Sequence, residues 1–273
     1  MFQQNEFFGL LLFLFLGIVG CGFPQSTSAP QDQNATQSSP FESVDSVLGV
    51  SSGQVPNEVL SRWFAGFDQE EIEKSKFIQN SVDIPIKLNT ALKEKIIEEE
   101  ISWIRLRGPD LSEDLRWLSS LGALRGLSIR YGKLVDADFN ALKRLGDLEW
   151  LDVSGVNIGS NNLPSLPNLE VLVMATSLTS DENIPQASQF PNLKVISLAG
   201  STVSNLGVQR LVEEFPNLRA LDLSHVRSID DNAVKQLVKL QKLKYLYLAG
   251  TRIGESQAEL LSKKLNCFIS FAN

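Results

Sequence analysis

The feature that most constrains this chain is a short motif, Leu-x-x-apolar-x-apolar, that recurs at a nearly constant spacing. Copies begin at residues 124, 148, 169, 193, 218 and 243, and a degenerate copy begins at Ile101, so successive copies lie 21 to 25 residues apart. A repeat of this length predicts a stack of similar units. One unit cannot bury its own apolar side, so it must pack against its neighbours.

Each unit is predicted to contain a short strand followed by a short helix. Within the motif, as from Leu193 to Leu198, apolar residues alternate with polar or small ones, which is the period of a half-buried strand. The run from Leu206 to Phe215 then takes the apolar spacing of one helical face. Pro191-Asn192 and Pro216-Asn217 precede the next strands and end the helices.

The motif resembles the leucine-rich repeat, whose consensus is Leu-x-x-Leu-x-Leu-x-x-Asn-x-Leu. The resemblance covers residues 101–273 and implies an α/β solenoid of about seven repeats with a helical N-terminal cap. It also implies a curved parallel sheet on the concave side and short helices on the convex side. The family's asparagine ladder cannot form here. In this respect the repeats of the chain resemble the divergent ribonuclease-inhibitor-like and F-box-associated repeats. The asparagine position is occupied by Gly132, Val156, Ser177, Ser201, Val226 and Thr251.

Residues 1–22 are predicted to be a signal peptide. Phe7 to Gly20 is an uncharged apolar run of 14 residues, which fits a signal-peptide core and is short for a membrane span. The run ends in Ile18-Val19-Gly20-Cys21, which resembles the bacterial lipoprotein signal. That resemblance implies that Cys21 is lipidated and anchors the chain to a bacterial membrane, on the periplasmic or cell-surface side. Two acyl chains or more make such anchoring stable.

Alternatives stay open for this N-terminal segment. Met1 to Glu6 contains no Lys or Arg, although the region before a signal-peptide core is normally basic. An ordinary signal peptide that is not lipidated, or a plain core helix, would also accommodate the apolar run. Lipidation and simple cleavage therefore remain separate predictions for Cys21.

The chain between the signal and the repeats divides into two predicted parts. Residues 23–56 are rich in Ser, Gln and Pro and are predicted to be a disordered linker, because they bury too little apolar area to offset the entropy of ordering. Residues 57–100 are predicted to be a helical N-terminal cap, with one helix capped by Asn57 and a second from Asn89 to Glu100. Ile84-Pro85-Ile86-Lys87-Leu88 is too short to assign.

The solenoid itself occupies residues 101–273 and is predicted to end in an edge strand between Leu265 and Phe271. Its charge is nearly balanced, with 18 acidic and 19 basic residues and no basic stripe of the kind nucleic acid requires, although the whole chain carries a net charge of −7. We therefore predict no nucleic-acid partner.

Catalytic and cofactor motifs are not evident. His225 is the only histidine, so the chain offers neither a histidine pair for a metal nor an ordinary Ser-His or Cys-His arrangement. The glycines fall at repeat turns and not in a phosphate-binding loop. We predict a protein that is not an enzyme, with no metal, no cofactor and no small-molecule substrate. A hydrolase using Asp222, Ser224 and His225 is the catalytic alternative.

The motif positions between the leucines are predicted to point out from the concave face, where large aromatic and Arg side chains favour binding. The candidate partner-binding residues are Trp103, Arg105, Arg107, Arg130, Trp150, Asp152, Asp222, Tyr245 and Tyr247. Two interpretations stay open: these residues bind a protein or peptide partner, or they pack beneath the cap and shield the last repeats.

The function predicted from these patterns is a non-catalytic protein–protein interaction scaffold that is anchored to a membrane outside the cytoplasm. The alternative is the substrate-recognition module of a ubiquitin-ligase-like, F-box-type system that acts with an enzyme in trans. That alternative requires the cytosol, so cleavage and acylation at Cys21 would exclude it.

Overall fold

A computed structural model describes most of the repeat region and two short stretches before it. The described residues are 51–53, 81–84, 88–107, 111–122, 124–130, 134, 136–156, 158 and 163–271. All of them belong to one compact unit, Glu42–Asn273. The predicted signal peptide with Cys21, the predicted helix at Asn57 and most of the predicted linker lie outside the described residues. None of the described helices is both long and apolar enough to span a bilayer.

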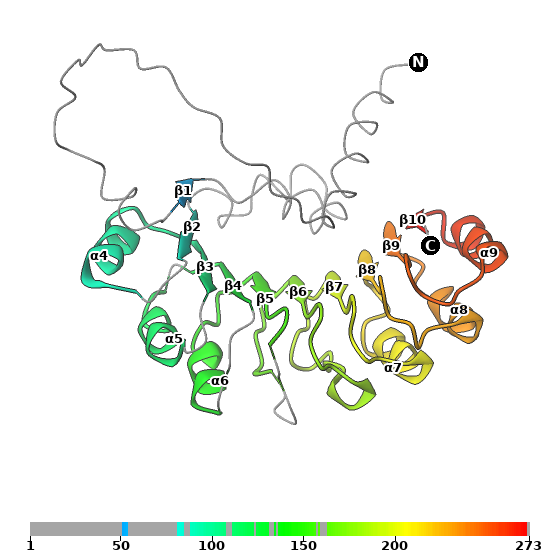
Figure 1. The fold of residues 1–273 in the computed structure, drawn as a ribbon, viewed down its shortest axis with the longest axis horizontal. Helices are drawn as coiled ribbons and strands as arrows, with labels where there is room; N and C mark the ends of the chain where they lie inside the picture. Colours follow the sequence, from blue (N-terminus) through cyan, green and yellow to red (C-terminus); the bar gives the residue numbers. More distant parts are fainter. Residues whose placement is uncertain are drawn as a thin grey trace, which may run out of the picture. The chain divides into compact units, whose positions relative to one another are not determined.

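The described strands form one sheet of ten strands in sequence order, with helices on its outer side (Figure 1). β1 and β2 pair antiparallel, and all later neighbours pair parallel. The strands are β1 Ser51–Gly53, β2 Ser81–Ile84, β3 Trp103–Arg107, β4 Gly126–Arg130, β5 Trp150–Asp152, β6 Val171–Val173, β7 Val195–Ser197, β8 Ala220–Asp222, β9 Tyr245–Tyr247 and β10 Phe268–Ser270.

The register of the sheet confirms the repeat. The fourth motif residue of each copy lies opposite the same residue of the next, as Leu127 lies opposite Leu151 and Leu151 opposite Leu172. The seven motif copies supply β3 to β9, and β10 is the predicted final edge strand. The fold is therefore the α/β leucine-rich repeat solenoid that the resemblance implied, with its strands on the inner side of the curve (Figure 1).

The helical segments on the outer side vary in length from repeat to repeat. They are α4 Thr90–Glu98, α5 Ser112–Leu118, α6 Asp136–Lys143, the 3₁₀ helix η2 Asp181–Asn183, α7 Asn205–Glu214, the 3₁₀ helix η3 Asp231–Ala233, α8 Val234–Leu237 and α9 Glu255–Leu265. A helix predicted from Asn89 to Glu100 is present as α4, whose N-cap Asn89 accepts a hydrogen bond from the Leu92 amide at 2.9 Å.

Two strands lie where sequence patterns did not indicate them. β2 falls within the region predicted to be a helical cap, and β1 falls within residues predicted to be linker. β2 pairs in parallel with the first motif strand, with Val82 opposite Ile104. A four-residue strand next to a proline carries too little pattern to recognise, but the free edge of β3 supplies hydrogen-bonding partners that select the extended conformation.

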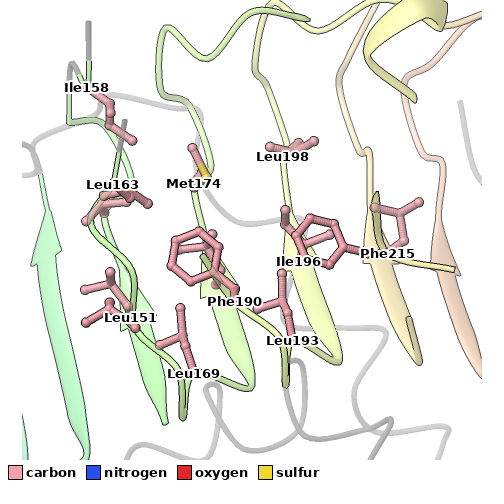
Figure 2. Packing of buried hydrophobic residues seen from close by; sticks show 14 of the residues in the cluster. Leu151, Ile158, Leu163, Leu169, Met174, Phe190, Leu193, Ile196, Leu198 and Phe215 are labelled. Atoms are coloured by element: carbon pink, nitrogen blue, oxygen red, sulfur yellow. The ribbon is translucent and has the colours of Figure 1, made fainter. Parts of the chain in front are cut away.

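The unit after β6 departs from the predicted strand–helix pattern. In residues 174–194, all of which are described, the only helical segment is η2. Pro185 stands where a helix would continue, and its ring would clash with the preceding turn while its nitrogen donates no hydrogen bond. The fully buried ring of Phe190 fills the space behind β6 beside Leu163 and Met174 (Figure 2).

The turns that follow β5 to β9 each use one residue with positive φ. These residues are Gly155, Thr176, Gly200, His225 and Gly250. The amides of the first four donate to a carbonyl of the next unit, as Gly200 donates to Ser224 at 2.8 Å and His225 to Ala249 at 2.6 Å. The turn therefore joins neighbouring units, and its backbone conformation is one that β-branched residues avoid.

Thr176→Gly is expected to raise the free energy of unfolding by about 0.5–1 kcal/mol. Thr176 holds φ at +50°, which costs an L-residue about 1–2 kcal/mol, and its exposed side chain leaves no cavity when removed. Urea unfolding would measure the change. Gly200→Ala is the opposite control: its φ is +65° and its new Cβ would lie 3.2 Å from Thr176 Cγ2, so this variant should lose stability. A lower stability of Thr176→Gly than of the wild type would contradict the proposed backbone strain at Thr176.

In the described units, the side chains at the position of the family's asparagine form no ladder of hydrogen bonds between repeats. The Ser177 hydroxyl donates back to the Met174 carbonyl at 2.6 Å, and the Thr251 hydroxyl donates to the Leu248 carbonyl at 2.7 Å. Val156 and Val226 are fully buried at the same position. The expected loss of the asparagine ladder is confirmed, since the hydroxyls satisfy carbonyls of their own unit; Gly132 lies outside the described residues.

Candidate functional site

The nine candidate residues all lie on strands of the sheet. Within each strand they alternate with the buried motif residues, so they occupy the opposite face, which we call the concave face. They are Trp103, Arg105 and Arg107 on β3, Arg130 on β4, Trp150 and Asp152 on β5, Asp222 on β8, and Tyr245 and Tyr247 on β9. The Arg107 side chain lies outside what the structure describes. The exposure of the others divides the face into two parts.

The first part, on β3 to β5, is packed tightly around two tryptophans. Trp103 and Trp150 are 1% and 0% exposed, and their ring centroids are 5.5 Å apart. Gly126 lies between them in the register, and a Cβ there would fall 2.0 Å from Trp103 Cδ1. The Arg105 guanidinium carbon lies 5.2 Å from the centroid of the Trp103 ring, in cation–π geometry. Of the two interpretations, packing within the protein describes the environment of these two indole rings.

Asp152 organises the polar contacts of this part of the face. Its carboxylate is fully buried and accepts hydrogen bonds from Arg130 Nε at 2.6 Å and Ser128 Oγ at 3.2 Å, both on the preceding strand. Its other oxygen accepts from the amide and the hydroxyl of Ser154, at 2.9 and 2.5 Å. The carboxylate thus joins β4 to β5 and holds the chain as it leaves the strand.

Asp222 repeats this arrangement on β8. It is 1% exposed and accepts from Ser197 Oγ of the preceding strand at 3.1 Å and from the Ser224 amide at 2.9 Å. His225 lies next in an exposed turn with φ of +61°, beside Gly250. Both aspartates share the order Asp-x-Ser and both act between strands, so Asp222 and Ser224 have a structural role that needs no hydrolase chemistry.

The second part of the face lies at the other end of the sheet and is open. Tyr245 and Tyr247 are partly exposed, and Phe268 on β10 is 50% exposed. The Tyr245 and Phe268 rings lie 6.0 Å apart, with 52° between their planes. We call Tyr245, Tyr247 and Phe268 the C-terminal aromatic patch. It lies where β9 and β10 end the row of strands (Figure 1).

Sequence reasoning found the two tyrosines of this patch and missed Phe268 and Gly126. Phe268 pairs with Tyr245 in the register, but the last strand lacks the full motif, so no spacing placed it on the face. Gly126 could have been recognised from its place, since it stands at the third motif position between tryptophans in the copies before and after it.

The thiol and carboxylate groups do not assemble into a metal site in the described part of the chain. No group of three His, Cys, Asp or Glu side chains there is arranged to hold a metal ion. Cys267, next to Phe268, is buried as predicted, and desolvation raises the pKa of its thiol above the ordinary value. The thiol is therefore kept neutral at physiological pH, which lowers its reactivity.

Comparison with known proteins finds distant structural likenesses only. No protein-family model matches the sequence. Among solved structures, internalin C2 of Listeria monocytogenes shares 20% identity over 63% of this chain and 71% of its own, with a TM-score of 0.41. A Bacteroides fragilis protein shares 17% identity over 75% and 77%, with a TM-score of 0.41. The mouse RP105/MD-1 complex matches over 59% and 37%, at 18% identity and a TM-score of 0.37. Likenesses at this level identify neither a partner nor an activity.

Proposed function

We propose that this chain is a non-catalytic scaffold that binds a protein or peptide partner at the C-terminal end of its concave face. The observation that carries this proposal is the C-terminal aromatic patch, which leaves three large rings in contact with solvent while the aromatic residues on β3 and β5 are buried. Exposed clusters of aromatic side chains are costly in water and are enriched in binding hot spots.

The remaining candidates take a different part in this proposal. Five of the candidates are buried, so they shape and stiffen the face on which the partner lies: Trp103, Arg105, Trp150, Asp152 and Asp222. Of the described Arg candidates, Arg130 has a side chain that is 33% exposed, which leaves it within reach of solvent near the first repeats. A partner long enough to follow the sheet would meet Arg130 after engaging the aromatic patch.

The location of the scaffold is also part of the proposal. The sequence Ile18-Val19-Gly20-Cys21 supports processing as a bacterial lipoprotein, and the polar stretch up to residue 56 supports a tether between membrane and solenoid. The full chain is then anchored to a bacterial membrane outside the cytoplasm. Cys21→Ser is expected to abolish fatty-acid labelling and to move the chain from the membrane fraction to the soluble fraction. An unprocessed cytosolic chain would instead fit the F-box-type alternative.

Replacing Tyr247 with Ser is expected to weaken partner binding by about tenfold or more while leaving the melting temperature within about 2 °C of the wild type. Binding would be measured by pull-down of the full-length chain from the native envelope fraction, with captured proteins quantified by mass spectrometry. Leu178→Ser is the matched control, because Leu178 is 65% exposed but lies outside the patch. Equal capture by wild type and both variants would refute the proposed surface.

A further inference from the structure

We infer that the outer edge of β10 is a strand-addition site for an extended peptide that carries acidic side chains. This inference rests on the proposed function and names the chemistry of its partner. Three independent observations carry it: the hydrogen-bonding edge of β10, the side chains that border that edge, and the charge around it.

The first observation is the backbone of β10. Its inner edge pairs with β9: the Phe268 amide donates to the Lys244 carbonyl at 2.9 Å, and the Ser270 carbonyl accepts from the Leu248 amide at 2.9 Å. Successive residues of a strand turn their backbone groups to opposite sides, so the N–H and C=O of Ile269 point away from β9. In the sheet formed by the described strands, nothing pairs with this outer edge. It therefore offers a donor and an acceptor to an added strand.

The second observation is that the side chains of the three-residue strand β10 include none that usually protects an edge strand. Proteins commonly protect edges with Lys, Pro or inward-pointing charges, whereas β10 reads Phe268-Ile269-Ser270. Phe268 is half exposed beside Tyr245, while Ile269 and Phe271 pack partly against the core. A strand laid along this edge would place an apolar side chain against the Phe268 ring and continue the concave face outward.

The third observation is positive charge on one side of this edge. Lys242 and Lys244 lead into β9, and Lys263 and Lys264 end α9 just before β10; all four are exposed. Across residues 241–271 there are five basic residues, Lys242, Lys244, Arg252, Lys263 and Lys264, against the two acidic residues Glu255 and Glu259. Among described ion pairs in this stretch, Lys263 with Glu259, at 3.8 Å, accounts for one lysine. Carboxylates on the added strand would complement the others and steer its approach.

The occupant that these features fit is therefore an extended segment with an apolar residue flanked by Asp or Glu. Its backbone would bond to Ile269, its apolar side chain would cover Phe268, and its carboxylates would approach Lys244 and Lys264. A second copy of this chain fits less well, because edge-to-edge pairing would bring two lysine clusters of like charge toward each other.

The test uses the full-length chain and two synthetic probes, a fluorescent seven-residue peptide alternating Glu with Val and Phe, and the same peptide with Lys in place of Glu. Fluorescence anisotropy should give at least about tenfold tighter binding of the acidic probe, weakening as salt rises. Equal affinity for the two probes, or no binding of the acidic one, would overturn the inference.

A matched pair of variants isolates the backbone edge. Ile269→Pro removes the outward N–H and blocks an incoming strand, while no hydrogen bond to β9 is lost; Ile269→Ala removes a similar amount of packing but keeps the N–H. The acidic probe should bind Ile269→Pro on the order of tenfold more weakly than Ile269→Ala. Equal binding by the two variants would overturn strand addition. Sedimentation showing a wild-type dimer that Ile269→Pro abolishes, without peptide binding, would assign the edge to a second copy instead.

The two proposals fail in different ways. If the native partner is lost with Tyr247→Ser but retained by Ile269→Pro, the aromatic patch binds and strand addition is wrong. If neither variant loses the partner, both proposals are wrong.

Discussion

Phe190→Ala is expected to lower the free energy of unfolding by about 3–5 kcal/mol, which is one of the two largest effects we predict. The ring is fully buried, and it lies in the unit whose outer side has only the 3₁₀ helix η2. Leu163 and Met174 line the space beside it, and no α-helix in residues 174–194 can move inward to fill the cavity (Figure 2). Urea unfolding followed by far-UV circular dichroism would measure the loss.

The control for this prediction lies in the same unit. Leu178 is 65% exposed, so Leu178→Ala should change the stability by less than about 0.5 kcal/mol. Phe190→Leu keeps most of the apolar volume and should fall between wild type and Phe190→Ala. If Phe190→Ala were as mild as Leu178→Ala, the ring would not be the support of this unit.

Asp152→Ala is expected to cost about 3 kcal/mol of stability, although it removes no apolar contact. The carboxylate receives hydrogen bonds from Arg130, Ser128 and the amide and hydroxyl of Ser154, and the two serines are themselves buried. Without it, buried donors lose their acceptor and Arg130 loses its ion pair. The guanidinium is partly exposed, which limits its share of the loss. Thermal and urea unfolding would report the change.

Two further variants separate charge from hydrogen bonding at this position. Asp152→Asn keeps one good acceptor but removes the charge, so it should retain more stability than Asp152→Ala. Arg130→Met leaves the buried carboxylate without its ion pair and should cost about 1–2 kcal/mol, less than Asp152→Ala because the guanidinium is partly exposed. If Asp152→Ala hardly changed the free energy of unfolding, the serines would have found other hydrogen-bond partners, and the contact between β4 and β5 would contribute little to stability.

The candidate site was only partly predictable from the motif. Alternation placed Trp103, Trp150, Tyr245 and Tyr247 correctly on one face, because the two-residue period of a strand decides which way a side chain points. Alternation does not decide exposure. Trp103 and Trp150 are buried, and Gly126 lets their rings meet across a strand, whereas Tyr245 on β9 remains partly open.

The regular spacing of apolar residues by itself determined that similar units stack and on which side of each strand the core lies, because each unit can bury its leucines only against the same residues of its neighbour; the resemblance to leucine-rich repeats added the parallel order of β3 to β9. The tertiary structure alone decided the rest: that β2 extends the sheet, that Phe190 replaces a helix, that Asp152 and Asp222 join strands, and that the open aromatic surface lies at β9 and β10. These depend on contacts between residues more than fifteen positions apart, which a local pattern does not specify.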